Sequence, residues 1–150
     1  MIDSTISSPA SEPLDALSRE LLTVRAADTP LDLEPHVDGL SRLAALGMVR
    51  ARVRGGTTLG LAEAMMSVVR EAAAGRLNPQ RPEHVLAQLL FRVHPSTAGL
   101  DPVAARKRTR EARRLTPRHF RAREEPRLCR LVAQAVLELA AEFDEAASGE

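Results

Sequence analysis

The sequence predicts an all-α protein, a compact bundle of about six to seven helices, and two observations lead to this fold class. Aromatic side chains are nearly absent, with three phenylalanines and no tryptophan or tyrosine among 150 residues. A core of Leu, Val, Ala and Met favours helices, because β-sheets depend on β-branched and aromatic side chains. Prolines suit the first helical position, where the amide that they lack would be unpaired anyway. Of ten prolines, six stand where a helix could begin: Pro13, Pro35, Pro82, Pro102, Pro117 and Pro126.

The first half of the chain predicts a polar tail followed by two helices. We expect residues 1–11 to be disordered and a helix to cover about 13–26, where Leu and Val recur at helical spacing. A second helix is expected over 35–46, with Gly47 as its cap. In 48–54, Val and Ala alternate with Arg, which permits a short strand or a continued helix. Helix is the favoured prediction.

The second half predicts further helices separated by clear breaks. A helix at 58–74 follows a glycine pair, and residues 75–82 form the best internal linker. We interpret 12–147 as one helical domain, with 75–82 as the candidate boundary inside it. Asp101 and Thr116 precede two of the prolines and are good cap residues. The remaining helices are expected at 82–94, 102–114, 117–124 and 126–146.

The last of these helices is long and apolar over most of its circumference. Between Leu128 and Phe143, its polar residues come every four positions: Arg130, Gln134, Glu138 and Glu142. A helix of this kind is buried by neighbours on several sides. We therefore predict that it is the central helix of the bundle, the alternative being half of a homodimer interface.

The composition argues against secretion and against a membrane protein. No stretch reaches the roughly 18 apolar residues that a membrane span requires. The first eighteen residues contain no Lys or Arg, which predicts that a secretory signal is absent. The single cysteine, Cys129, excludes an intrachain disulfide and is compatible with a reducing compartment. We expect a cytoplasmic protein.

Sequence patterns that carry catalysis are missing. The four histidines lack the spacing of metal ligands. The segment RGGTTLG, residues 54–60, lacks the Gly-Lys-Ser/Thr ending of a phosphate-binding loop. Cys129 belongs to the apolar final helix, where a cysteine is usually an inert small hydrophobe. These patterns predict a protein that is not an enzyme and that uses no cofactor or metal.

The sharpest functional feature is a concentration of positive charge at 102–127. This segment holds ten of the 21 basic side chains and three acidic ones, a local charge of +7. Because the whole chain carries +1, the rest carries −6. Such asymmetry is typical of proteins that bind an acidic surface. Lysine occurs once, however, and an arginine-rich composition of this kind is also expected of solvated helices from a GC-rich genome.

Helical geometry gathers the basic residues of this segment. At about 100° per residue, five of them fall within about 120° of one another on the helix at 102–114: Arg106, Lys107, Arg110, Arg113 and Arg114. Ala104, Ala105, Ala112 and Leu115 occupy the opposite side. On the helix at 117–124, Arg118 and Arg121 share a face roughly opposite Phe120, which should anchor inward. Two helices joined by a turn at 115–116 would resemble a helix-turn-helix.

These seven basic residues are therefore expected to bind an acidic surface, with duplex DNA the leading candidate. RNA and single strands fit less well, because their recognition uses exposed aromatic side chains. The alternative is a protein–protein interaction adaptor, in which the arginines serve solubility or contact an acidic protein.

The stretch ARKRTREARRLTPRHFRAREEPRLCRLVAQAVLELA resembles a helical segment found in actinobacterial proteins. In that segment, an arginine-rich helix, a Phe-Arg helix and a Glu-Pro-x-Leu-Leu motif precede an apolar helix. The resemblance covers residues 100–141 and rests on Phe120, Glu125-Pro126 and Leu128. It implies a small helix-turn-helix-like adaptor attached to signalling or conflict-system proteins. This chain departs from it at Arg114, in place of a turn glycine, and at Arg110, in place of a small apolar residue. Both departures favour a role as an adaptor over sequence-specific recognition of DNA.

Overall fold

The chain folds into helices joined by loops and turns. Among residues 12–149, which the computed structural model describes, no strand occurs. The predicted all-α fold is therefore confirmed, and 48–54 is helical over most of its length, as favoured. The expected tail at 1–11 lies outside the described residues. In chain order the elements are α1 (Glu12–Ala26), α2 (Pro30–Leu33), the 3₁₀ helix η2 (Glu34–Gly39), α3 (Ser41–Ala44), α4 (Gly47–Arg52), α5 (Thr58–Arg76), α6 (Pro82–Leu90), α7 (Pro102–Ala112), α8 (Pro117–His119), the π-helical turn η3 (Phe120–Glu124) and α9 (Glu125–Ser148).

Side-chain caps explain where α7 and α8 begin. The Asp101 carboxylate accepts a hydrogen bond from the Ala104 amide at 2.8 Å, at the start of α7. The Thr116 hydroxyl accepts one from the His119 amide at 3.2 Å, at the start of α8. Each cap is followed by a proline, so one first-turn amide is satisfied by the cap and another is absent.

The prediction of a single helix over 35–46 is wrong. Two short elements, η2 and α3, occupy this region instead, and a third, α2, comes directly before it. The helix α2 begins at Pro30, and the Asp32 carboxylate accepts a hydrogen bond from the Thr29 amide at 3.2 Å. The start of α3 is capped by a side chain of another helix. The Glu20 carboxylate of α1 accepts hydrogen bonds from the amides of Arg42 and Leu43 at 3.0 and 2.9 Å. A cap that comes from a distant helix leaves no local sequence pattern.

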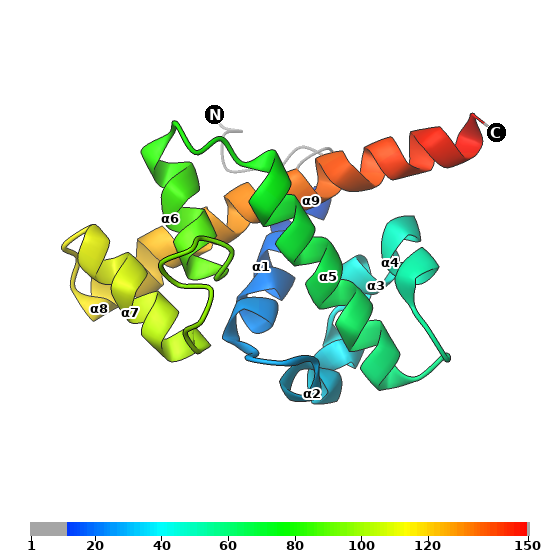
Figure 1. Cartoon of the computed structure of the whole chain (residues 1–150), viewed down its shortest axis with the longest axis horizontal. Helices are drawn as coiled ribbons and strands as arrows, with labels where there is room; N and C mark the ends of the chain where they lie inside the picture. The colour runs from blue at the N-terminus through cyan, green and yellow to red at the C-terminus, as the bar shows by residue number, and fades with distance from the viewer. Residues whose placement is uncertain (1–11, 150) are drawn as a thin grey trace, which may run out of the picture.

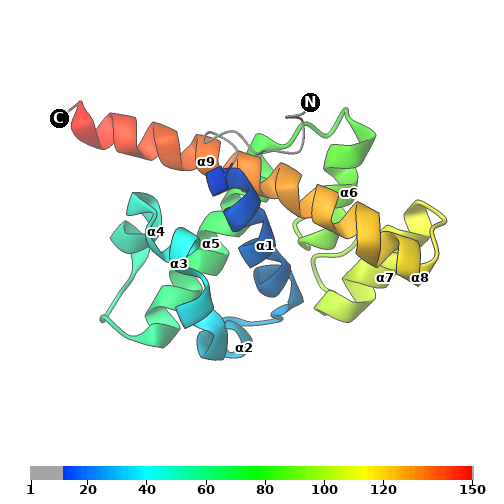
Figure 2. The same cartoon turned by 180° about the vertical axis from the view of Figure 1, so that it is seen from behind.

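The helix α9 runs through the molecule, as Figures 1 and 2 show from opposite sides. It packs against α1, α5 and α6, and the side chains that it buries include Leu128, Val132 and Val136. Its predicted polar stripe, from Arg130 to Glu142, faces solvent. The prediction of a central helix is confirmed up to Ala140, whereas residues 141–149 are exposed and extend beyond the bundle.

The helices expected at 117–124 and 126–146 are one continuous helix, so Pro126 does not restart the chain. The join is the π-helical turn η3, in which the Glu125 amide donates to the Phe120 carbonyl, five residues back. In an α-helix, the ring of a proline clashes with the carbonyl four residues earlier. The wider π turn gives room for Pro126, so the helix continues from α8 through η3 into α9 without a gap.

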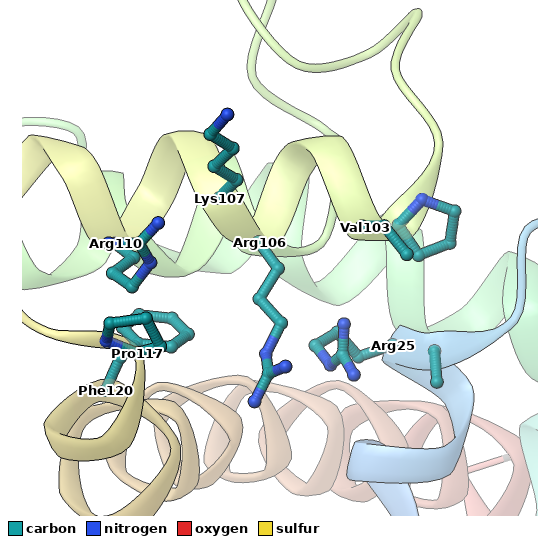
Figure 3. Close-up of a pocket in the computed structure, with 9 residues that line it drawn as sticks. Arg25, Val103, Arg106, Lys107, Arg110, Pro117 and Phe120 are labelled. Carbon is teal, nitrogen blue, oxygen red and sulfur yellow. The ribbon is translucent and has the colours of Figure 1, made fainter.

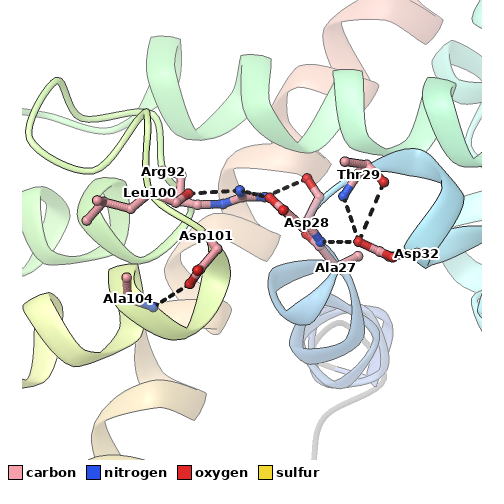
Figure 4. Close-up of polar contacts among 8 residues, drawn as sticks. All are labelled: Ala27, Asp28, Thr29, Asp32, Arg92, Leu100, Asp101 and Ala104. Carbon is pink, nitrogen blue, oxygen red and sulfur yellow. Dashed lines mark hydrogen bonds and ion pairs between the residues drawn. The ribbon is translucent and has the colours of Figure 1, made fainter.

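Arg92 positions the start of α7 relative to the end of α1 (Figure 4). Its guanidinium group donates to the carbonyl oxygens of Ala27, Asp28 and Leu100 at 3.0–3.1 Å and lies 2.6 Å from the Asp28 carboxylate. The Arg92 backbone adopts φ of +61°, a conformation that is rare outside glycine. Sequence patterns gave no sign of this residue, because its partners are far away in the chain.

Candidate functional site

The basic segment forms a corner at one end of the molecule, made of α7, a short turn, and the continuous helix that starts with α8 (Figure 1). The turn is a Schellman arrangement: the Leu115 amide donates to the Arg110 carbonyl at 3.2 Å, and the Arg114 amide to the Glu111 carbonyl at 3.0 Å. Arg114 has φ of +56°, the left-handed conformation that usually selects glycine. This is the position at which the resembled segment carries its turn glycine.

Phe120 fixes the corner from inside. Its side chain is 1% exposed, which confirms the predicted inward anchor. On α7, Ala105 and Thr109 are also buried, and the Thr109 hydroxyl donates to the Ala105 carbonyl at 2.8 Å. Ala112, expected on the inward side, is exposed, because α7 ends there and the turn carries the chain away from the core.

Arg106 belongs to a buried ion cluster and is not a free surface cation. It donates three hydrogen bonds of 2.7–3.1 Å to the Glu125 carboxylate, which is 3% exposed. The Arg25 Nε lies 2.6 Å from the same carboxylate. In Figure 3, Arg106 reaches from α7 towards the continuous helix, while Lys107 points to the other side of α7. The sequence reading missed Arg25 and Glu125, since three separate helices supply the cluster.

Two more of the predicted binding residues have partners inside the chain. The Arg110 Nη1 donates to the Leu115 carbonyl at 3.1 Å, so this side chain closes the turn. The Arg113 Nε lies 3.3 Å from the Glu124 carboxylate, which is 5% exposed. These contacts hold α7 against the continuous helix, and they reduce the charge that is available to an outside partner.

The other basic residues of the corner point outward. Within the segment 102–127, six exposed basic side chains have neither a hydrogen bond nor an ion pair: Lys107, Arg114, Arg118, Arg121, Arg123 and Arg127. We call these six the basic surface. It contains four of the seven predicted binding residues, and it is supplied by α7, the turn and the continuous helix.

Within the described residues, no three His, Cys, Asp or Glu side chains are grouped as metal ligands. None of the described helices combines the length and the apolar character that crossing a membrane would demand.

No protein-family model, no curated protein and no solved structure matches the chain. The resemblance of residues 100–141 to an actinobacterial adaptor segment therefore stays a prediction.

Proposed function

We propose that the basic surface binds the phosphate backbone of duplex DNA and that the protein is a non-enzymatic regulatory module. The observation that carries this proposal is the group of six exposed cations without partners at one corner of the molecule. Each cation that meets a phosphate releases condensed counterions, which is the main source of non-specific affinity for DNA.

The proposed contact uses the two helices of the corner differently. Arg118 and Arg121 lie in the first turns after Thr116, the place from which the second helix of a helix-turn-helix reaches base edges. Lys107 and Arg114 precede the turn and are suited to phosphates on one side of the groove. Phe120 and the Arg106–Glu125 pair keep the two helices at a fixed angle, so the cations need little reorganisation on binding.

A salt titration of binding to a labelled duplex tests the proposal. The logarithm of the binding constant should fall with the logarithm of salt concentration, with a slope of about −0.9 for each phosphate contacted. A triple variant with Arg114→Glu, Arg118→Glu and Arg121→Glu should lose binding at about 50 mM salt while keeping its helical circular dichroism, a salt level at which phosphate contacts are only weakly screened.

A charge-matched control separates the corner from the net charge of the chain. Arg42, Arg50 and Arg54 are exposed, and their side chains have no partner among the described residues. Their replacement by Glu changes the net charge by the same amount at another place. Binding should survive in this control. Loss of binding in both triple variants, or no retention of wild type on duplex DNA at about 50 mM salt, contradicts the proposal.

The alternative is an adaptor that docks on an acidic protein. It is favoured by the internal partners of Arg106, Arg110 and Arg113, which leave fewer cations for phosphates. The adaptor is supported if wild-type protein binds immobilised poly-glutamate but not duplex DNA, and if the corner triple variant no longer binds poly-glutamate.

A further inference from the structure

A cleft of about 270 Å³ lies between the end of α1 and the corner formed by α7 and α8 (Figure 3). Its cationic lining consists of Arg25, Arg106, Lys107 and Arg110, and no Asp or Glu is among the residues that line it. Apolar side chains supply the rest of the wall: Pro102, Val103 and Phe120. The cleft shares Lys107 with the basic surface, whereas Arg114, Arg118, Arg121, Arg123 and Arg127 are not among the residues that line it.

The positive charge in the cleft exceeds the negative charge beneath it. Glu125 is the one carboxylate that the described structure pairs with either Arg25 or Arg106, and the two guanidinium groups share it. The Arg25 side chain is 12% exposed, and its Nε–H is not directed at the nearby carboxylate oxygen, so this buried nitrogen has no hydrogen-bond acceptor. Burial lowers the pKa of Arg25, Glu125 opposes this effect, and Arg106 adds to it. A half-buried excess of positive charge is costly, and a bound anion would offset it.

The walls of the cleft select an anion that also carries apolar atoms. The centre of the Phe120 ring lies 5.8 Å from the guanidinium carbon of Arg106, so this ring, itself 1% exposed, packs against the charge from the inside of the cleft. At the lip, Val103 is 78% exposed although it is a large apolar side chain. The volume is just below the roughly 300–1,000 Å³ of typical ligand pockets, so the ligand must be small.

We propose that this cleft binds a small organic anion, a carboxylate or a phosphate monoester attached to an apolar body. The anionic oxygens accept hydrogen bonds from Arg25 and Arg110, whose guanidinium groups keep unused N–H donors, and the apolar body lies against Pro102 and Val103. The proposed DNA contact shares Lys107 with the cleft, but Arg114, Arg118 and Arg121, on which its test depends, do not line the cleft.

Calorimetric titration with four small probes tests the proposal on the full chain at low salt. Phenyl phosphate and benzoate carry an anion on an apolar ring, inorganic phosphate lacks the ring, and benzyl alcohol lacks the charge. At least one of the first two should bind, tenfold or more tightly than inorganic phosphate, and benzyl alcohol should not bind. The stronger of the two shows whether the cleft prefers a phosphate or a carboxylate. A probe at ten times its Kd should also raise the Tm by about 4 °C, because it binds only the folded protein.

Variants at Val103 place the probe in the cleft. Val103→Glu puts a carboxylate at the lip, whereas Val103→Gln has nearly the same shape without the charge. Because Val103 is exposed, both variants should fold. Val103→Glu should weaken probe binding at least tenfold, Val103→Gln only a few-fold, and Arg110→Gln should also weaken it. Arg114→Gln, on the basic surface, should leave it unchanged.

Two results would overturn the proposal. One is that neither phenyl phosphate nor benzoate binds at about 10 mM, a concentration at which even a weak site of millimolar Kd is occupied. The other is that binding responds to Arg114→Gln but not to Val103→Glu, which assigns the anion to the basic surface. Neither result bears on duplex DNA binding, which is measured with the corner triple variant.

Discussion

The carboxylate of Glu125 joins three helices, because it pairs with Arg25 of α1 and Arg106 of α7 from the first residue of α9. Its carboxylate is almost fully buried and meets guanidinium groups from α1 and α7, so it ties both helices to the start of α9. Removing one partner of a buried ion pair usually costs more than the pair itself contributes, because the other charge stays behind. In sequence, Glu125 stands before a proline and looks like a helix cap. Its actual role depends on Arg25, a hundred residues earlier.

Cys129 is a buried spacer whose chemistry gives a pH-dependent prediction. Its side chain is 0% exposed, and burial, followed by the negative charge of Glu125, raises the thiol pKa from 9.0 to about 12. An acid whose pKa is raised by folding stabilises the protein below its unfolded pKa, and this stabilisation is lost as the pH rises towards the folded pKa. The affected window is therefore about pH 9 to 12.

We expect wild type to be more stable than Cys129→Ala by about 1 kcal/mol near pH 7, the usual size of a modest core truncation. This advantage should shrink by about 1.4 kcal/mol at pH 10, because the unfolded wild-type thiol ionises there while the folded one stays protonated. Urea unfolding of both proteins at pH 7 and pH 10 measures the difference. The alanine variant is the internal control for all other groups that titrate in this range. A stability difference that stays constant or grows with pH would show that the thiol is not buried in the folded protein.

At the scale of the elements, the sequence predicted those helices whose boundaries are marked locally. Proline and a preceding Asp or Thr marked α7 and α8, and the apolar pattern of α9 marked the centre of the bundle. The region 30–44 was not predictable in this way, because Glu20 of α1 caps α3 from a distance. The continuity across Pro126 was also hidden, since proline signals a helix start in most contexts.

The candidate site was predictable in composition but not in orientation. Counting charges located the basic corner, and a regular 100° helical wheel placed Arg106 with Lys107 on one outward face. The structure turns Arg106 inward, because Glu125 offers a buried carboxylate on the neighbouring helix. A helical wheel shows which side chains share a face, but it cannot show which face meets a partner.

The end of α7 gives a prediction about backbone conformation. Arg114 occupies the left-handed position of the Schellman turn, where a side chain costs roughly 1 kcal/mol relative to glycine. Arg114→Gly should therefore raise the free energy of unfolding by about 0.5–1 kcal/mol, despite the greater entropy of the unfolded glycine chain. Arg108→Gly, at an exposed position inside α7, should lower it by a similar amount. Chemical denaturation of the two variants side by side checks the opposite signs. Destabilisation by both substitutions would mean that Arg114 makes a contact that outweighs its backbone strain.

Over the whole molecule, the charges are separated along α9. The basic surface lies at the end that holds α7 and α8, and the exposed last turns of α9 lie at the other end (Figures 1 and 2). The last ten residues, 141–150, contain four acidic and no basic side chains: Glu142, Asp144, Glu145 and Glu150. Acidic residues near a helix C-terminus oppose the helix dipole. The positions of Glu142, Asp144 and Glu145 are therefore unfavourable for the helix itself. Glu142 pairs with Arg76, and the other two place negative charge at this end of the molecule, which repels a polyanion.

This charge separation leads to a prediction for a chain shortened after Ala140, which changes the net charge from +1 to +5. From Arg127 to Glu142 the helix rises by about 1.5 Å per residue, or roughly 22 Å. The Debye length is about 30 Å at 0.01 M salt and about 8 Å at 0.15 M, so repulsion between the acidic end and DNA is felt only at low salt.

The shortened chain should bind duplex DNA several-fold more tightly than the full chain at about 10 mM salt and equally at about 150 mM. A full-length variant with Glu142→Gln, Asp144→Gln and Glu145→Gln should bind nearly as tightly as the shortened chain, because it loses three of the same four negative charges and keeps the helix. Equal affinities of all three proteins at 10 mM salt would show that the acidic end has no influence on the basic surface, whereas a difference that persists at 150 mM would require direct contact of residues 141–150 with the DNA.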